Sequence, residues 1–189
     1  MIIRCDWAKS EPNITYHDAE WGIPQHDDQK LFEFLILEGA QAGLTWTTIL
    51  NRRDGYRKAF SNFDPKVVSK YNKKKVATLL QDKSIIRNRL KINSAINNAQ
   101  CFLEIQQEFG SFDKYLWAFV DFRPILNEYE KSSDLLASTE ISTNLSKDLK
   151  KRGFTFVGPT ICYALMQAVG MVNDHTVACF RYTECQQQN

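Results

Sequence analysis

The sequence predicts an all-α protein, and three observations support this fold class. Apolar residues recur at helical spacing along most of the chain, and residues that start or stop helices stand at the ends of these segments. Runs that alternate apolar and polar residues, as strands do, are nearly absent. The 189 residues are 43% hydrophobic and 24% charged, a composition typical of a globular protein with a sizeable core. We expect one compact domain over residues 1–189, without internal repeats or linkers.

Helices are expected one after another along the chain. In order, the expected helical segments are residues 27–43, 45–60, 64–71, 73–81, 87–110, 111–120, 143–153 and 159–170. Thr45, Asp64 and Asn72 are candidate N-caps, because their side chains can accept a hydrogen bond from an amide of the first turn. Gly43 is expected to end the first segment. Residues 123–142 are irregular and polar, and we interpret them as a surface excursion.

The last two expected helices frame a tight turn between Gly153 and Gly158. The second of these helices begins at Pro159, directly after a glycine, so its first backbone amides are unobstructed and favour an anion. Basic side chains precede the turn, and exposed amides together with basic side chains suit a phosphate backbone. The alternative is an ordinary pair of helices with a solvated basic face. The basic residues are Lys147, Lys150, Lys151 and Arg152.

Charge and cysteine content narrow the function classes only a little. The formal net charge is +2 at pH 7, which neither demands nor excludes nucleic acid as a partner. The first residues lack the apolar core and cleavage site of a signal peptide, and no apolar run reaches the ~20 residues of a membrane span. We therefore expect a cytoplasmic protein without a membrane partner. Five irregularly spaced cysteines argue against a disulfide framework, and Cys101 and Cys162 are predicted to be core residues.

Two cysteines and two histidines at opposite ends of the chain form a candidate metal site. His175 and Cys179 are four residues apart, a spacing that places both on one face of a helix. Cys5 and His17 stand near the other end, where a loop has to bring them together. Two thiolates and two imidazoles suit tetrahedral zinc, and a site filled by four protein ligands is closed and structural. The alternative is that the cysteines are small buried hydrophobes and the histidines are surface residues.

Four stretches of the sequence resemble one family of DNA repair enzymes. They are RCDWAKSEPNITYHDAEWGIP, LFEFLILEGAQAGLTWTTIL, KRGFTFVGPTICYALMQAVGMVNDH and a closing HxxxC, and they span the chain from Cys5 to Cys179. Together they closely resemble the bacterial 3-methyladenine DNA glycosylase I family. The resemblance implies an all-α, helix-hairpin-helix DNA glycosylase fold, with the helix-hairpin-helix element at about residues 143–170. It also implies one structural Zn²⁺ that joins the N- and C-terminal segments through Cys5, His17, His175 and Cys179.

The resemblance implies a monofunctional DNA glycosylase of base-excision repair. Such an enzyme hydrolyses the N-glycosidic bond of 3-methyladenine in duplex DNA and leaves an abasic site. The implied partners are double-stranded DNA that contains alkylated adenine, and free 3-methyladenine as the product, with the chain acting as a monomer. Methylation at N3 makes the purine cationic, so its glycosidic bond is already weak. The enzyme then mainly needs a pocket for the flipped-out base, with aromatic faces and one carboxylate.

Glu38 is the expected catalytic and base-binding carboxylate, because it ends a run of four apolar residues and would be costly to bury unpaired. Its expected role is to accept hydrogen bonds from the amine edge of the base and to offset its charge. By contrast, Glu33 is expected on the solvated edge of the same helix. Trp46 is expected to stack on the base, and Tyr16 and Trp21 are expected to line the same pocket. Core packing is the alternative for each aromatic residue.

The residues expected to contact DNA come from two places in the chain. Gly43 and Leu44 combine a small residue with an apolar tip, as a wedge into the base stack requires. Gly153 and Gly158 frame the turn between the last two expected helices, whose amides are expected to contact phosphates, and Thr160 at the start of the second helix is also expected to contact DNA.

Three polar residues are left without a base-binding role at this stage. Some relatives have a tyrosine in place of Asn13, so the resemblance leaves open whether this residue contacts the base. Asp174 stands next to His175, and we expect it to support that metal ligand rather than to act in the chemistry. Asn173 stands where related glycosylases that excise stable bases have a catalytic aspartate, and an amide cannot act as a base.

Two other functions compete with this interpretation. The first is a helix-hairpin-helix glycosylase with lyase activity, which would need a lysine near the start of the helix that begins at Pro159, and none is present there. The second is a non-catalytic, zinc-stabilised DNA-binding protein. Such a protein would have no reason to place Glu38 next to Trp46.

Overall fold

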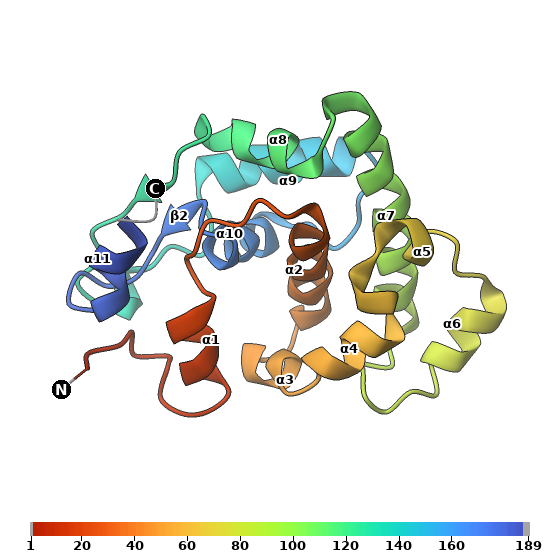
Figure 1. Cartoon of the computed structure of the whole chain (residues 1–189), viewed down its shortest axis with the longest axis horizontal. Coiled ribbons are helices and arrows are strands. Elements are labelled where there is room, and N and C mark those ends of the chain that lie inside the picture. The colour runs from red at the N-terminus through yellow and green to blue at the C-terminus, as the bar shows by residue number, and fades with distance from the viewer. Residues whose placement is uncertain (1, 187–189) are drawn as a thin grey trace.

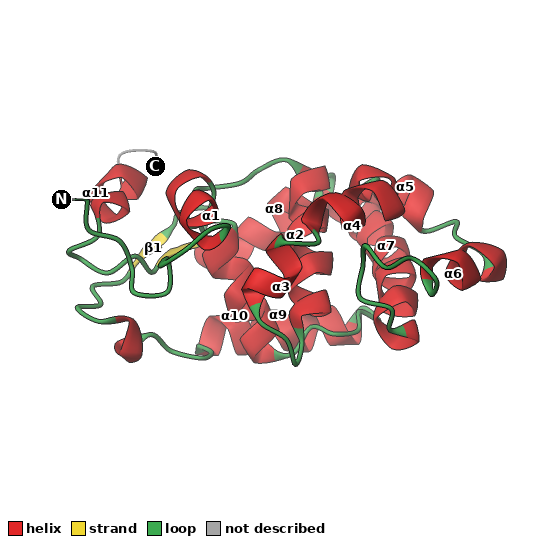
Figure 2. Cartoon of the chain, turned by 90° about the horizontal axis from the view of Figure 1, so that it is seen from below, coloured by secondary structure: helices red, strands yellow, loops and turns green. Residues whose placement is uncertain are grey.

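The computed structural model describes residues 2–186, and most of these residues are helical (Figures 1 and 2). This agrees with the predicted class, apart from two very short strands described below. The α-helices are α1 (Asn13–Ala19), α2 (Asp28–Gln41), α3 (Trp46–Leu50), α4 (Arg53–Ala59), α5 (Pro65–Val68), α6 (Lys73–Leu79), α7 (Arg89–Phe109), α8 (Phe112–Trp117), α9 (Glu140–Lys151), α10 (Pro159–Ala168) and α11 (Phe180–Gln186). Short 3-10 helices lie at η1 (Ser61–Phe63), η2 (Ala118–Val120) and η3 (Ser132–Asp134).

Helix α2 lies at the centre of the molecule (Figure 1). Every residue from 31 to 40 is buried, because α3, α7, α8 and α10 pack around the helix. An α-helix enclosed on all sides is apolar around its whole circumference, which explains the continuous apolar run in this segment. Its last turn is thereby held in a fixed position relative to α7 and α10, and this is the end from which Glu38 projects.

The helix ends follow local sequence rules. Thr45, Asp64 and Asn72 each accept a hydrogen bond from a first-turn amide, at the start of α3, α5 and α6 respectively. Gly43 follows α2 with a φ of +76°, a left-handed conformation that glycine adopts without steric cost. The predicted caps are therefore confirmed, and Gly43 allows the chain to turn sharply between α2 and α3.

The segment predicted as one helix over residues 45–60 is divided into α3 and α4. The break allows Arg53, the first residue of α4, to direct its guanidinium toward α2, where its Nε donates to Glu33 at 2.7 Å. Arg53 also donates to Glu20 at 2.8 Å, after the end of α1. These ion pairs between separate helices are not visible in a local periodicity, and they hold α4 against the central helix.

Glu33 is buried rather than solvated, so the prediction for this residue is wrong. Its side chain is only 4% exposed and accepts hydrogen bonds from Arg53 and, at 2.9 Å, from Arg57. Burial by itself raises the pKa of Glu33, but the charge and hydrogen bond of Arg53, with Arg57 and Lys30, outweigh it and lower the pKa. The carboxylate is therefore a paired anion inside the protein.

Two short strands join the region after α8 to the region after α10. Strand β1 (Ile125–Leu126) pairs in parallel with β2 (Val172–Asn173), and Ile125 pairs with Val172. Strands of two residues are too short to produce an alternating pattern, which is why the sequence did not indicate them. The pairing anchors the segment 123–142 to the body of the protein, so this segment is less detached than the predicted surface excursion.

The two ends of the described chain lie together on one side of the molecule (Figures 1 and 2). The amide of Phe180, at the start of α11, donates to the carbonyl oxygen of Ile3 at 3.0 Å. Neither α1 nor α11 was expected from the sequence. Within residues 2–186, no helix is long and apolar enough to cross a membrane.

Candidate functional site

A cavity of about 340 Å³ lies between α1, α2, α3 and α10. The four residues predicted to bind a base, Tyr16, Trp21, Glu38 and Trp46, all line it. The complete lining consists of Trp7, Asn13, Tyr16, Trp21, Glu38, Gln41, Trp46, Thr47, Leu135, Ala164 and Gln167. The cavity is therefore an aromatic box with one carboxylate, assembled from segments far apart in the sequence.

Glu38 is the single acidic residue of this lining, and it is buried without a partner. Its carboxyl group makes no hydrogen bond or ion pair with any residue in the described chain, although it is only 4% exposed. Burial alone raises the pKa of Glu38 to about 8. An unpaired buried carboxyl group that faces a cavity is costly to ionise, and a cationic, hydrogen-donating ligand would remove that cost.

The aromatic walls are held in place by contacts with one another. Tyr16 is buried and packs against Trp46 with ring centroids 5.3 Å apart. Trp7 meets Trp21 edge to face at 5.0 Å. Burial, followed by the charge of Glu38, raises the pKa of Tyr16, so its hydroxyl stays protonated and can donate. Planar faces and a phenol donor around Glu38 suit a planar, cationic heteroaromatic ligand.

Several residues of the lining were missed by the sequence reasoning. Asn13 does reach the cavity, where its side-chain amide donates to the hydroxyl of Thr47 at 2.9 Å. Leu135 also lines the cavity, although it belongs to the segment interpreted as a surface excursion. Gln41 lies one helical turn after Glu38, and that spacing on α2 was a signal that could have identified it. Leu135 had no comparable signal, because only the tertiary fold brings it to the site.

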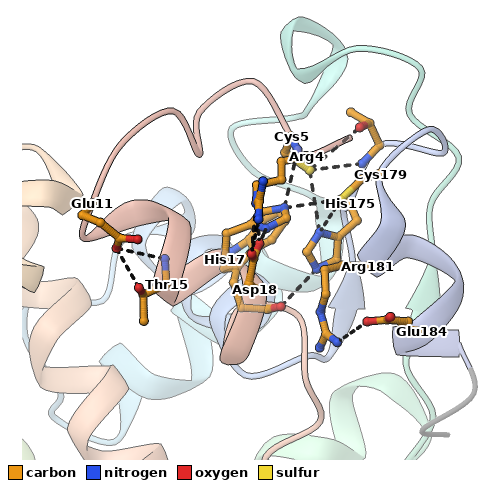
Figure 3. Close-up of polar contacts among 12 residues, drawn as sticks. Arg4, Cys5, Glu11, Thr15, His17, Asp18, His175, Cys179, Arg181 and Glu184 are labelled. Carbon is orange, nitrogen blue, oxygen red and sulfur yellow. Dashed lines mark hydrogen bonds and ion pairs between the residues drawn. The ribbon is translucent and has the colours of Figure 1, made fainter. Parts of the chain in front are cut away.

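A second cluster brings together Cys5, His17, His175 and Cys179, and all four side chains are buried (Figure 3). One potential ligand atom from each residue lies within 4.8 Å of the others. The Sγ of Cys179 is 3.4 Å from Nε2 of His17 and 3.6 Å from Nδ1 of His175. The Sγ of Cys5 is 3.7 Å from the same Nδ1. The predicted set of four residues therefore does converge, from the two ends of the chain.

The histidines of this cluster are oriented by hydrogen bonds on their outer nitrogens. Nδ1 of His17 lies 2.7 Å from the carboxylate of Asp18, which is itself paired with Arg4. Nε2 of His175 lies 3.1 Å from the carbonyl oxygen of Trp21. The opposite ring nitrogens, Nε2 of His17 and Nδ1 of His175, are thereby directed at the thiols. Asp18, adjacent to His17, is a supporting residue that the sequence reasoning missed.

Two expectations about this region are wrong. The segment 175–179 is a turn that precedes α11 and not a helix, so His175 and Cys179 meet by chain reversal rather than by helical spacing. Asp174 makes no hydrogen bond to the cluster within residues 2–186. Its buried carboxylate instead accepts hydrogen bonds at 2.7 Å from Asn127, Tyr163 and Gln167.

The side chain of Asn173 is bonded to backbone groups of Tyr182 and His175. Its amide donates to the carbonyl oxygen of Tyr182 at 3.0 Å, and its side-chain oxygen accepts from the amide of His175 at 3.3 Å. Neither Asn173 nor Asp174 is among the residues that line the cavity. The carboxylate that the cavity presents is therefore that of Glu38.

The turn between α9 and α10, which we call the hairpin turn (residues 153–158), leads into a helix start that no side chain caps. Gly153 has a φ of +90°, and no side chain caps the start of α10 at Gly158. A methyl group added to Gly158 would meet nothing within 4 Å. The start of α10 thus combines uncapped amides with open space beside Gly158, an arrangement that suits an anion.

The region after α2 lies next to the start of α10. We call residues 41–45 the wedge turn. A second cavity of about 210 Å³ is lined by Gly43, Leu44 and Thr160, and it also reaches Glu38. Leu44 is 39% exposed despite its apolar side chain. Gly43 and Leu44 of the wedge turn are thus brought beside Thr160 of α10, while Gly153 and Gly158 belong to the hairpin turn that precedes this helix.

Arg152 is not free to contact an anion, in contrast to the predicted basic face. Its guanidinium bonds to Glu108 at 2.6 Å and to Asp148 at 2.8 Å. It also lies over the rings of Phe109 and Tyr115. This residue therefore ties α9 to α7 and α8, and the basic face is reduced to the three lysines.

Comparison with known proteins places these features in context. The chain matches the model of the methyladenine glycosylase family over residues 7–182. It is 48% identical over 180 residues to DNA-3-methyladenine glycosylase 1 of Escherichia coli (strain K12), with 95% of this chain and 96% of that protein covered. It is 43% identical over 180 residues to the DNA-3-methyladenine glycosylase of Haemophilus influenzae (strain ATCC 51907 / DSM 11121 / KW20 / Rd), with 95% and 97% covered.

Solved structures give the same result. A crystal structure of 3-methyladenine DNA glycosylase I superimposes with a TM-score of 0.92 at 47% identity, covering 94% of this chain and 98% of that one. A variant of 3-methyladenine DNA glycosylase I in complex with 3-methyladenine superimposes with a TM-score of 0.91 at 36% identity, covering 94% and 96%.

Proposed function

Since the chain belongs to the methyladenine glycosylase family, we propose that it hydrolyses the N-glycosidic bond of 3-methyladenine in duplex DNA and leaves an abasic site. The observation that carries the proposal is the unpaired, buried carboxyl group of Glu38 inside an aromatic cavity. A cationic purine supplies the charge and the amine hydrogens that Glu38 lacks. Neutral adenine supplies no charge, so the cavity discriminates between damaged and normal bases.

The chemistry needs little more than selection of the base. Alkylation at N3 makes the purine a cationic leaving group that departs neutral, so no strong general acid is required. Glu38 stabilises the base in the pocket, Trp46 stacks on it, and Tyr16 and Trp21 form the remaining walls. No lysine lines the cavity, which supports a monofunctional hydrolase over a glycosylase that forms a covalent lyase intermediate.

The buried Cys and His cluster is proposed to hold one structural Zn²⁺. Two sulfurs and two nitrogens form a donor set that zinc favours, and a tetrahedral zinc ion places neighbouring sulfur and nitrogen ligands about 3.5 Å apart. The separations of 3.4 to 3.7 Å between these atoms fit that requirement. The ion would supply a cross-link between the chain ends, and all four ligand positions would be filled by protein.

DNA is proposed to bind across the wedge turn and the hairpin turn, in the manner of a helix-hairpin-helix protein. The amides at the start of α10, with Gly153, Gly158 and Thr160, would hold phosphates, and Leu44 after Gly43 would enter the space left by the flipped nucleotide. The exposure of Leu44 and the open space at Gly158 support these roles. We propose that the chain acts as a monomer and within the cytoplasm.

The proposal is tested by base release from alkylated duplex DNA. The purified protein is expected to release 3-methyladenine, and Glu38→Gln is expected to keep the fold while losing binding of free 3-methyladenine. A hydrogen bond to a charged group contributes roughly 1.5–3 kcal/mol, so the loss should be at least about tenfold. Glu104→Gln, at an exposed position of α7, is the matched control.

Two outcomes would contradict the proposed function. Failure of the wild-type protein to release any alkylated base would leave a non-catalytic DNA-binding protein as the explanation. A borohydride-trapped adduct with DNA would indicate lyase chemistry instead.

A further inference from the structure

One face of α7 is bonded to both turns that are proposed to contact DNA. Lys91, Ser94 and Asn98 are three and four residues apart, so they lie along one side of this helix. Ser94 and Asn98 are buried, although both are polar. Each of the three side chains bonds to another segment. Lys91 bonds to the region of the wedge turn, and Ser94 and Asn98 bond to the hairpin turn.

Lys91 closes the end of α2. Its Nζ donates to the carbonyl oxygens of Ala40 at 2.8 Å and Ala42 at 2.7 Å. Helix α2 has no basic residue in its own last turn, so Lys91 is the cation that meets its exposed carbonyls and the negative end of its dipole. These two carbonyls flank Gln41, the first residue of the wedge turn, so Lys91 fixes how that turn leaves the helix.

Asn98 and Ser94 hold the hairpin turn through Thr155. The side-chain oxygen of Asn98 accepts from the amide of Thr155 at 2.9 Å, and its amide donates to the carbonyl oxygen of Thr155 at 2.9 Å. The hydroxyl of Thr155 donates to Ser94 at 2.8 Å. Asn97 adds a bond to the carbonyl oxygen of Gly153 at 2.8 Å. All the polar groups of Thr155 are thus directed to α7, although the residue lies at the surface.

The hairpin turn also lies directly against α2, close to the end of that helix. A methyl group added to Gly39 would lie 3.4 Å from Cβ of Phe156, so the helix and the turn are already at close range. Phe156 has a φ of +55°, an uncommon conformation for a residue other than glycine. A turn in this conformation needs support from its surroundings, and α7 supplies it.

We propose that Lys91 and Asn98 are positioning residues, which hold the wedge turn and the hairpin turn at one fixed separation so that both engage the same duplex. This inference rests on the proposed function, in which the two turns contact DNA. The two side chains are seven residues apart on one rigid helix, or about 10 Å along its axis. Insertion of the wedge and capture of the phosphate must occur together, so a change in their separation weakens base flipping even though neither residue touches the base.

Lys91→Met tests the wedge end, because methionine keeps an unbranched apolar stem and removes the donors. Single-turnover release of 3-methyladenine from a fully paired duplex is expected to fall at least tenfold. Binding of free 3-methyladenine is expected to stay at the wild-type level, because the cavity contains neither Lys91 nor its partners. Lys74→Met, at an exposed position of α6 without side-chain partners on either turn, removes the same charge and is the matched control.

Two further measurements separate positioning from other roles of Lys91. When the damaged base is placed opposite a mismatch it is easier to flip, so the loss in Lys91→Met is expected to shrink several-fold. The dependence of duplex binding on salt is expected to keep its wild-type slope, whereas a lost phosphate contact would reduce the slope by about one. Lys91→Arg, which can still donate to two carbonyls, is expected to restore most of the excision.

Asn98→Ala tests the hairpin end, with Ser94→Ala as the milder variant if the first is poorly folded. Weaker binding to all duplexes is expected, with binding of free 3-methyladenine retained. The inference is overturned if Lys91→Met matches Lys74→Met on paired duplex, or if its loss is equal on paired and mismatched DNA. Absence of excision by the wild-type protein would instead refute the proposed function, so the two failures are distinguishable.

Discussion

The unpaired carboxyl group of Glu38 should make the stability of the protein depend on pH in a way that Glu38→Gln removes. In the unfolded chain this group has an ordinary pKa of 4.5, whereas burial raises the pKa to about 8 in the folded protein. Between these values the folded state holds a proton that the unfolded state has released. The free energy of unfolding therefore falls as the pH rises from about 4.5 to 8. Below about 4.5 the group is protonated in both states, so it causes no loss of stability there.

The magnitude follows from the gap between the two pKa values. Each pH unit between the two pKa values lowers the free energy of unfolding by about 1.4 kcal/mol, so the full gap corresponds to roughly 5 kcal/mol. Because the carboxyl group faces a cavity that water can enter, this figure is an upper bound. Glutamine has the same shape and does not titrate, so the variant should gain stability relative to the wild-type protein as the pH rises.

The measurement is urea unfolding of wild-type and Glu38→Gln protein at pH 5, 7 and 9. The variant is expected to be more stable by a margin that grows with pH and reaches several kcal/mol at pH 9. The other ionisable groups are common to both proteins, so their contributions cancel in the difference. Glu104→Gln, at an exposed site, should follow the wild-type curve. A difference between Glu38→Gln and wild type that is constant with pH would refute the reasoning.

Three further predictions concern the metal cluster, the hairpin turn and the buried aspartate. Purified protein should contain one zinc ion per chain by elemental analysis, and Cys179→Ala should lose metal and thermal stability before activity per folded molecule; a zinc content far below one would contradict the site. Gly158→Val should fold normally, because the added side chain meets open space. In a binding titration it should lose the same factor of affinity for damaged and for undamaged duplexes. Asp174→Asn should lower the free energy of unfolding by about 1–3 kcal/mol. The carboxylate accepts three hydrogen bonds, and the substitution replaces one of its two accepting oxygens with a donating amide group. If the folded Asp174→Asn variant lost several orders of magnitude in single-turnover excision, Asp174 would instead be the catalytic carboxylate.

Features set by neighbouring residues could be predicted from the sequence. The caps at Thr45, Asp64 and Asn72 depend on one side chain and an amide two or three residues further along, so local chemistry decides them. The same holds for the turn at Gly43. The environment of Glu33 could not be predicted in this way, because its partners Arg53 and Arg57 come from another helix and convert an expensive burial into an ion-pair network.

In the candidate site, too, some features could be predicted from the sequence and others depend on contacts between distant residues. The resemblance to a known family predicted which residues form the base pocket and the metal site, and the structure brings them into one cavity and one cluster. It did not identify the residues that fix their orientation. Asp18 and the carbonyl oxygen of Trp21 orient the two histidines, and Leu135 closes the cavity from a segment without a regular pattern. Such roles depend on contacts between distant parts of the chain, and local periodicity does not indicate these contacts.

The meeting of the two chain ends has a consequence for synthesis of the protein. Cys5 and His17 are synthesised long before His175 and Cys179, so the first pair remains without its partners until residue 179 has emerged from the ribosome. The carbonyl oxygen of Trp21 bonds to His175, and the ring of the same residue forms a wall of the cavity. Trp21 therefore belongs to both the cluster and the cavity wall, so its backbone gains this bond only after the residues near position 175 have been made.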